Sequence, residues 1–193
     1  GNLNDFSLRS INTLKEVDII FAEDTRVTSK LLKYFDIQKK TRPLHEHNEA
    51  KVSDDIIKLI KNGSAIALLS DAGAPLISDP GYPLIQRCIK ENICFTVLPG
   101  PSAVINAVIL SGLPSDKFLF NGFLPKQTEA KRKIALKLQN SDLTNIYFES
   151  AKRISKTISI FSEVLRPDTQ LAICREMTKE FESVYKGTVD EVL

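Results

Sequence analysis

Apolar and polar positions follow two patterns along this chain, one typical of buried strands and one typical of helices. Continuous apolar, β-branched runs indicate strands covered on both faces. The predicted strands are residues 18–22, 64–69, 93–98, 118–121, 145–148 and 171–174. Between them, apolar residues recur every three or four positions, which predicts helices at 8–14, 52–60 and 154–165. Ser7 and Ser150 are the expected N-caps of the first and last of these helices.

The repeated strand–helix alternation predicts an α/β protein with a largely parallel sheet and right-handed crossovers. A turn-rich Ser-Gly-Leu-Pro-Ser-Asp break at 111–116 is the expected boundary between two domains. These are an N-terminal domain at 1–114 and a smaller C-terminal domain at 115–193. We expect the first strand of the N-terminal domain to be missing and the C-terminal domain to be truncated.

Composition is that of a globular protein. Of 193 residues, 42% are apolar and 26% are charged, which disfavours disordered and collagen-like chains. No apolar stretch approaches the roughly 20 residues that cross a bilayer, and no signal-peptide pattern is present. Three scattered cysteines form neither a disulfide framework nor a zinc pattern, and His45 and His47 have no further ligands beside them. We expect a cytoplasmic protein without a metal site.

The net charge of +2 is too small to indicate a nucleic-acid binder by itself. Two local clusters are more basic, and either a solvated helix face or a nucleic-acid contact accounts for them. One cluster consists of Lys30, Lys33, Lys39, Lys40 and Arg42, and the other of Lys126, Lys131, Arg132, Lys133 and Lys137.

Two loops that follow predicted strands are rich in small residues and proline. They cover residues 70–82 and 99–103. Ligands of open α/β sheets collect at the carboxyl ends of strands, and small residues let a ligand reach the backbone amides. Asp71 and Asp79 add carboxylates to the first loop, and the second opens a helix whose free N–H groups favour an anion. Each loop alone could be an ordinary turn; together they predict a ligand site.

Other strand ends carry charged residues at 23–26, at Glu149 and at 175–179. Buried charges need partners, so a cleft with a polar substrate is one explanation, and helix caps or ion pairs are the other. The glycine-rich dinucleotide motif, the Walker lysine loop and the Gly-x-Ser-x-Gly elbow are absent from the sequence. This disfavours dinucleotide oxidoreductases, P-loop NTPases and α/β-hydrolases.

Eight short motifs occur in an order that resembles a known family. They are Gly-Asn-Leu-x-Asp at 1–5, Glu-Asp-Thr-Arg at 23–26, His-Glu-His-Asn-Glu at 45–49, Ser-Asp-Ala-Gly-x-Pro-x-Ile-Ser-Asp-Pro-Gly at 70–81, Pro-Gly-Pro-Ser-Ala at 99–103, Ser-Gly-Leu-Pro at 111–114, Gly-Phe-Leu-Pro at 122–125 and Arg-Glu-x-Thr-Lys-x-Phe-Glu at 175–182. Together they resemble the 16S rRNA (cytidine-2′-O)-methyltransferases of the tetrapyrrole-methylase-fold superfamily.

The resemblance implies two α/β domains with S-adenosyl-L-methionine in the cleft between them, in a homodimer. It also implies methyl transfer to the ribose 2′-hydroxyl of a cytidine in the decoding region of 16S rRNA, within the small ribosomal subunit. Phe123, Lys126 and the basic helix after them would lie toward RNA. The residues expected to contact the cofactor are Asn2, Asp71, Ala72, Gly73, Ala74, Pro75, Gly100, Pro101, Ser102, Ala103, Phe148, Glu149, Arg175, Glu176, Met177 and Thr178.

A ribose hydroxyl is a poor nucleophile and needs a base or a field that favours its alkoxide. The expected catalytic residues are Glu23 or Asp24 as the base, with Arg26 and Lys126 as stabilising cations. The chain departs from the family at 148–153, where Phe-Glu-Ser-Ala-Lys-Arg replaces Tyr-Glu-Ser-Pro-His-Arg, and Ala74 replaces a common threonine. No histidine role is therefore expected at 148–153. A tetrapyrrole or other small-molecule acceptor, and a noncatalytic ribosome-assembly factor, are the alternatives.

Overall fold

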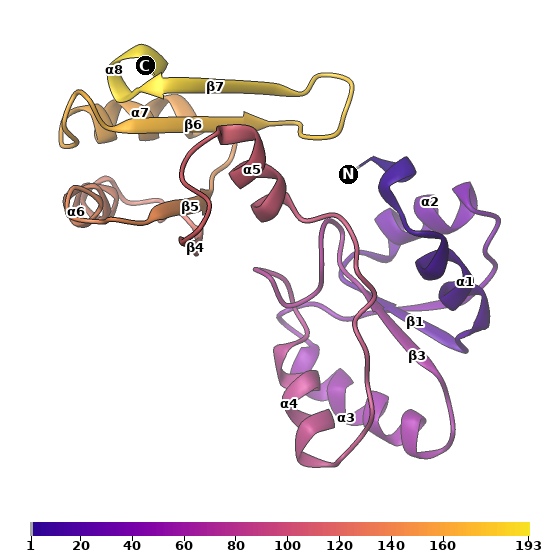
Figure 1. Cartoon of the computed structure of the whole chain (residues 1–193). Helices are drawn as coiled ribbons and strands as arrows, with labels where there is room; N and C mark the ends of the chain where they lie inside the picture. The colour runs from indigo at the N-terminus through magenta and orange to yellow at the C-terminus, as the bar shows by residue number, and fades with distance from the viewer. Residues whose placement is uncertain (1) are drawn as a thin grey trace. The chain divides into compact units, whose positions relative to one another are not determined.

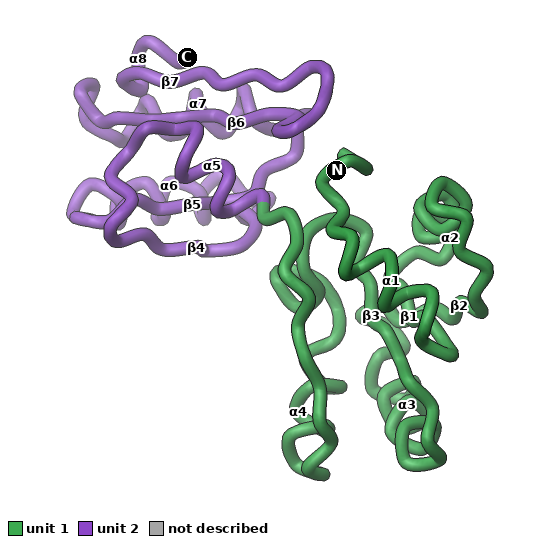
Figure 2. The backbone as a smooth tube through the Cα atoms, turned by 45° about the vertical axis from the view of Figure 1, so that its right-hand side comes forward, with its two compact units in different colours: residues 1–102 green, residues 103–193 purple. Residues whose placement is uncertain are grey.

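A computed structural model describes residues 2–193, and contacts between them divide the chain into two compact units (Figure 2). Unit 1 is Gly1–Ser102 and unit 2 is Ala103–Leu193. The division therefore comes earlier than the turn-rich break at 111–116. Helix α5 (Ala103–Ser111) falls in unit 2 because it packs against strands of that unit, β6 and β7.

Unit 1 is built on a three-stranded parallel sheet in the order β2-β1-β3. The strands are β1 (Ile19–Ala22), β2 (Lys40–Pro43) and β3 (Ile66–Leu69). The helices are η1 (Leu3–Asp5), α1 (Leu8–Glu16), α2 (Thr25–Tyr34), α3 (Glu49–Lys61) and α4 (Tyr82–Lys90). The parallel pairing confirms the predicted α/β class and brings the ends of β1, β2 and β3 to one edge.

The central strand β1 is buried from end to end because helices cover both faces of the sheet (Figure 1). Successive side chains of a strand point to opposite faces. Accordingly, Ile19 and Phe21 pack with residues of α3 and α4, including Ile56 and Leu84. Ile20 packs on the other face with residues of α1 and α2. The continuous apolar run at 18–22 is explained by this two-sided burial.

Unit 2 contains two small sheets. Strands β4 (Phe118–Phe123) and β5 (Thr144–Phe148) are parallel, whereas β6 (Gln170–Arg175) and β7 (Ser183–Thr188) form an antiparallel pair. The remaining helices are α6 (Thr128–Leu138), α7 (Ile154–Ser162) and α8 (Val189–Val192). Residues from α6, α7 and α8 share one core, of which Ala135, Phe161 and Val189 are buried members.

One predicted strand is absent from the structure, and two observed strands were not predicted. Residues 93–98 form no strand, and Phe95 and Val97 in that segment are 49% and 69% exposed. An apolar run becomes a strand only when it pairs with a neighbour. The polar strands β2 and β7 were not predicted because their sequences, Lys-Thr-Arg-Pro and Ser-Val-Tyr-Lys-Gly-Thr, lack a continuous apolar run. The antiparallel β6–β7 pair also departs from a largely parallel sheet.

The predicted helices at 8–14, 52–60 and 154–165 correspond to α1, α3 and α7, and Ser7 caps α1 by accepting a hydrogen bond from Ser10 N at 3.1 Å. Ser150 is not the N-cap of α7, because that position is Arg153; instead the Ser150 hydroxyl accepts from Arg153 Nε at 3.1 Å. Within residues 2–193, no helix is long and apolar enough to cross a membrane.

Candidate functional site

The exits of β1 and β3 are joined by two hydrogen bonds between acidic residues. Asp24 N donates to Asp71 Oδ1 at 3.2 Å, and Asp71 N donates to Glu23 Oε2 at 3.4 Å. These bonds exist because the two strands are parallel neighbours, so their carboxyl ends meet at the same edge. The sequence predicted this edge as the ligand site, and the structure brings Glu23, Asp24 and Asp71 together there.

Glu23 and Asp79 both prefer their neutral form more than an ordinary carboxyl does. Burial raises the pKa of Glu23, and repulsion from Asp79, Asp71 and Asp24 raises it further, against a hydrogen bond from the Asp71 backbone. Burial also raises the pKa of Asp79, with repulsion from Asp71 added and a hydrogen bond from Ser70 opposing. Carboxyls with raised pKa values are suited to accept a proton or to pair with a cation.

Asp24 has a different environment from Glu23. It caps α2 by accepting from Arg26 N at 2.8 Å, and the Arg26 guanidinium binds both of its oxygens. The Arg26 hydrogen bonds lower the pKa of Asp24 to about 2. A strongly ionised, already bonded carboxylate is a weak proton acceptor, so the geometry favours Glu23 over Asp24 as a base.

The loop after β3 presents its backbone to solvent. Asp71 to Ala74 are exposed, and Ser70 Oγ donates to Gly73 O at 3.2 Å, which closes a tight turn. Gly73 has φ 76°, a conformation that suits glycine. Leu76 and Ser78 also have positive φ, 73° and 64°. Such values cost free energy in residues with a side chain and persist only where surrounding contacts impose them.

The second loop lies beside the first. A Cβ added at Gly73 would be 3.9 Å from Pro101 O, whereas a Cβ at Gly100 would meet nothing within 4 Å. The exposed residues 71–74 and 99–100 therefore belong to neighbouring loops within unit 1. This observation supports the prediction that the two loops belong to the same ligand site.

Unit 2 contains a buried polar cluster at the exit of β5, centred on Glu149. Its Oε2 binds Lys131 Nζ at 2.8 Å and accepts from Thr157 Oγ1 at 2.8 Å, and Lys131 also bonds Thr157. Its Oε1 binds Arg153 at 2.6 Å and accepts from Ser150 N at 2.8 Å. Burial opposes ionisation, but the bonds from Lys131, Ser150 and Thr157 outweigh it and lower the pKa of Glu149.

Lys131 was expected to belong to a basic surface that faces RNA, and the structure contradicts this. Its side chain is 3% exposed and that of Glu149 is 4% exposed. Lys131 lies on the same helical face as the buried Ala135, four residues later. A lysine at that apolar spacing was the signal in the sequence for a buried ion pair. Lys126 and Lys133 are exposed, and Arg132 pairs with Glu129 and Glu163.

The predicted residues between β6 and β7 form a tight connection. Glu176 and Thr178 have positive φ, 50° and 64°, and Thr178 N donates to Glu182 Oε2 at 2.6 Å. Glu176 pairs with Lys179 at 3.1 Å. Arg175 is the last residue of β6. The backbone shape of this turn is therefore fixed by its own side chains.

Of the other predicted residues, Phe123 is 61% exposed and its ring lies 5.3 Å from that of Phe148. Phe148 also contacts Phe120, with ring centroids 4.9 Å apart. Asn2 caps η1 by accepting from Asn4 N at 3.0 Å. Within unit 2, Phe123 and Phe148 thus form one aromatic pair at the ends of β4 and β5.

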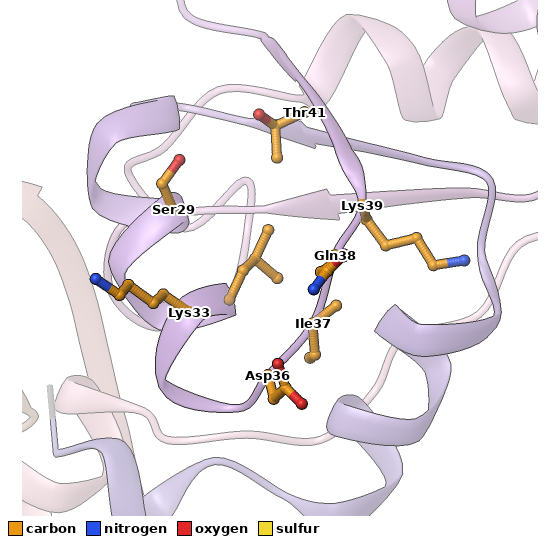
Figure 3. A pocket seen from close by; sticks show the side chains of 8 residues that line it. Ser29, Lys33, Asp36, Ile37, Gln38, Lys39 and Thr41 are labelled. Carbon is orange, nitrogen blue, oxygen red and sulfur yellow. The ribbon is translucent and has the colours of Figure 1, made fainter.

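A pocket of about 290 Å³ lies elsewhere in unit 1, between the end of α2 and the start of β2 (Figure 3). It is lined by Ser29, Leu32, Lys33, Asp36, Ile37, Gln38, Lys39 and Thr41. The ammonium groups of Lys33 and Lys39 extend away from each other in Figure 3. Because it adjoins the start rather than the exit of β2, this pocket is not at the carboxyl edge. Residues 2–193 contain no group of three His, Cys, Asp or Glu that could hold a metal ion.

The fold and these strand exits define a class of enzyme. The family model described as Tetrapyrrole (Corrin/Porphyrin) Methylases matches residues 1–193, and the chain belongs to this family of methyltransferases. The resemblance inferred from the eight motifs is confirmed at the level of the family and its fold.

Curated relatives named "Ribosomal RNA small subunit methyltransferase I" align with the whole chain. The relative from Vibrio cholerae is 44% identical over 193 residues, which are 67% of its length. That from Rickettsia prowazekii is 43% identical over 69% of its length, and that from Thermotoga maritima is 41% identical over 86%.

Solved structures share the fold at low identity. The methyltransferase CobJ has a TM-score of 0.70 at 15% identity, with 100% of this chain and 84% of that chain covered. Diphthine synthase has a TM-score of 0.70 at 15% identity, with 98% and 78% covered. These structures confirm the α/β tetrapyrrole methylase fold.

Proposed function

We propose that the chain methylates small-subunit ribosomal RNA with S-adenosyl-L-methionine as the methyl donor, and that the acceptor is the 2′-hydroxyl of a decoding-region cytidine. Identity above 40% to relatives named as small-subunit rRNA methyltransferases supports the RNA substrate. The observation that carries the proposal is the carboxyl edge of the unit 1 sheet. There an exposed small-residue surface lies beside Glu23, whose pKa is raised.

The residues at this edge fit the proposed methyl donor. The exposed backbone of residues 71–74 and the open space at Gly100 allow a ligand to approach without meeting side chains. An exposed carboxylate such as Asp71 can bind an ammonium group or a ribose hydroxyl. S-adenosyl-L-methionine supplies both the methyl group and its own leaving group. The proposed contacts from unit 1 are Asn2, Asp71, Ala72, Gly73, Ala74, Pro75, Gly100, Pro101 and Ser102.

The proposed contacts from unit 2 are Ala103, Phe148, Glu149, Arg175, Glu176, Met177 and Thr178. Both carboxylate oxygens of Glu149 are already bonded. We therefore propose that Glu149 holds the chain at the β5 exit in shape and meets the cofactor through its backbone. Glu176, paired with Lys179, has the same role in the β6–β7 turn.

Glu23 is the proposed general base. The acceptor hydroxyl must lose its proton as the new bond forms, and a carboxylate with a raised pKa is a better proton acceptor than an ordinary one. Asp24 would orient Arg26 rather than take the proton. Arg26, 88% exposed at its side chain, and Lys126, also exposed, are the proposed cations that stabilise charge near the acceptor or its phosphates.

In the experiment, the full-length protein is incubated with radiolabelled S-adenosyl-L-methionine and unmodified small ribosomal subunits. The labelled nucleotide is then mapped. Label on one cytidine 2′-oxygen of the decoding region is the expected result. Label elsewhere on the RNA would overturn the acceptor but keep the enzyme class. Cofactor binding without transfer to RNA would point to a tetrapyrrole or other small acceptor, and absence of cofactor binding would leave an assembly factor. The proposed homodimer is checked on the same sample by light scattering.

A further inference from the structure

One motif has no role in the proposed chemistry, the His-Glu-His-Asn-Glu segment at 45–49 that connects β2 to α3. Its last residue, Glu49, is the first residue of α3 and is half-buried. Glu49 Oε2 accepts a hydrogen bond from Gly81 N at 2.9 Å. This bond joins the exit of β2 to the far end of the 70–82 loop, 32 residues later in the chain.

Gly81 is the N-cap of α4, and its backbone N–H donates to the Glu49 carboxylate, in the way that the N-cap N–H of a capping box donates to a glutamate. Its φ is 125°, and an added Cβ would lie 2.8 Å from Leu68 Cδ2 and 3.0 Å from Leu76 Cδ1. Any residue with a side chain would therefore clash at position 81. The Glu49 carboxylate comes from another helix and lies at the N-termini of both α3 and α4, where helix dipoles favour negative charge.

Hydrogen bonds from the Asn48 side chain stabilise the segment that carries Glu49. Asn48 Oδ1 accepts from His45 N at 2.9 Å, and Asn48 Nδ2 donates to Pro43 O at 3.3 Å. Ser53 Oγ donates to the Glu49 carbonyl at 2.6 Å, one helical turn on. The carboxylate is thus carried by a turn that has its own hydrogen bonds.

The 70–82 loop depends on such an anchor. Leu76 and Ser78, between the exposed turn and Gly81, have positive φ, which only surrounding contacts can maintain. At its start the loop is held by Ser70 Oγ and by the bonds between Glu23, Asp24 and Asp71. At its end the bond from Gly81 to Glu49 does the same.

We propose that Glu49 is a positioning residue that presets the 70–82 loop for the methyl donor, by holding Gly81 at the start of α4. The inference rests on the proposed function, because it assigns the loop to cofactor binding. A loop already in its bound shape loses less conformational freedom when a ligand binds. Glu49 therefore contributes to affinity for the donor without contacting it.

The test compares three variants of the full-length protein: Glu49→Ala, Glu49→Gln and Asp55→Ala. Glutamine keeps an oxygen that accepts from Gly81 N, and Asp55 is an exposed acid on the same helix. Calorimetry with S-adenosylhomocysteine measures Kd, and initial rates give kcat and KM. For Glu49→Ala we expect Kd and the donor KM to rise about tenfold, with kcat and the RNA KM changed less than about twofold. Glu49→Gln should recover most of the affinity, and Asp55→Ala should match the unsubstituted protein.

Hydrogen exchange in the ligand-free protein separates this proposal from the proposed function. Glu49→Ala should speed exchange of the Gly81 amide and of peptides covering 70–82, whether or not the protein binds the donor. Unchanged exchange in 70–82 would overturn the anchor, as would an unchanged Kd in a variant with faster exchange. Equal loss in the Gln and Ala variants, with a matching fall in the folded fraction, would show a merely structural role. Failure of the unsubstituted protein to bind S-adenosylhomocysteine would contradict the proposed function and with it the loop's role in cofactor binding.

Discussion

Two glutamates directly follow a parallel strand in this molecule, Glu23 after β1 and Glu149 after β5, and their surroundings are opposite. Glu23 has acidic neighbours, and its pKa is raised. Glu149 is enclosed by Lys131, Arg153 and Thr157, and its pKa is lowered. No salt bridge among residues 2–193 involves Glu23, whereas Glu149 takes part in two.

The comparison shows that an acid at a strand exit does not by itself mark a catalytic group. Burying a charge is costly unless a partner compensates it. In unit 2, Lys131 and Arg153 compensate the buried charge of Glu149, so this charge stabilises the fold. Glu23 in unit 1 has a raised pKa, and this agrees with its proposed role as the general base.

The largest expected effect comes from breaking the Glu149 pair from its basic side. Lys131→Met leaves a buried carboxylate without its main partner, and we expect it to lower the free energy of unfolding by about 3–5 kcal/mol. Urea unfolding at pH 7 measures the change. Lys133→Met, on the exposed face of the same helix, is the control and should cost less than about 0.5 kcal/mol. Equal effects at positions 131 and 133 would contradict the buried pair.

Glu23 should show the reverse, with a large effect on rate and little on stability. Glu23→Gln is expected to lower kcat about 10²–10⁴-fold, the usual range for loss of a general base. Because the pKa of Glu23 is raised above its ordinary value of 4.5, the unsubstituted enzyme should lose activity as the pH falls toward and through that raised pKa. Rates of methyl transfer across pH measure both effects. Glu46→Gln, an exposed neighbour of His47, is the control; a Glu23→Gln enzyme with full turnover would remove Glu23 as the base.

The 70–82 loop beside Glu23 is shaped by backbone conformation rather than by ion pairs. A substitution at Gly81 tests this. Gly81→Ala is expected to destabilise the fold by about 2–3 kcal/mol, from the strain of a positive φ and the contact with Leu68 and Leu76. Gly63→Ala shares the positive φ but has open space around it, so its cost should be about 1 kcal/mol. Thermal unfolding measures the difference, and equal costs would show that the close approach of Gly81 to β3 does not matter.

The smallest effect is expected where the ion pair is exposed. Arg26→Ala removes the guanidinium that binds Asp24, and we expect only a small fall in the unfolding midpoint at pH 7, because solvent screens the pair. The pKa of Asp24 should rise from about 2 toward its ordinary value of 3.8, so the fall in stability should disappear as the pH is lowered through this range. Carboxyl resonances followed by NMR across pH give this value directly. An unchanged pKa would mean that the helix N-terminus, rather than Arg26, holds Asp24 ionised.

The sequence by itself predicted the α/β class, five of the seven strands within residues 2–193, and the helices at 8–14, 52–60 and 154–165. It also placed Glu23, Asp24 and Asp71 at strand exits, without specifying that these exits are neighbours. These features are local: each depends on an apolar run, a periodic face or a turn-rich loop that a few consecutive residues encode. The motifs at 23–26 and 70–81 lie at strand exits for the same reason.

Only the tertiary structure decided which charges are paired. Lys131 looks like its neighbours Arg132 and Lys133 in the sequence, but its side chain meets Glu149, 18 residues away, in the interior. Glu49 reaches Gly81 across 32 residues, and Asp71 reaches Glu23 across 48. Strand pairing was also decided by the tertiary structure. The polar segments β2 and β7 form strands, whereas the apolar segment 93–98 does not. An ion pair or a ladder is a property of two segments brought together by the fold, so neither segment alone can specify it.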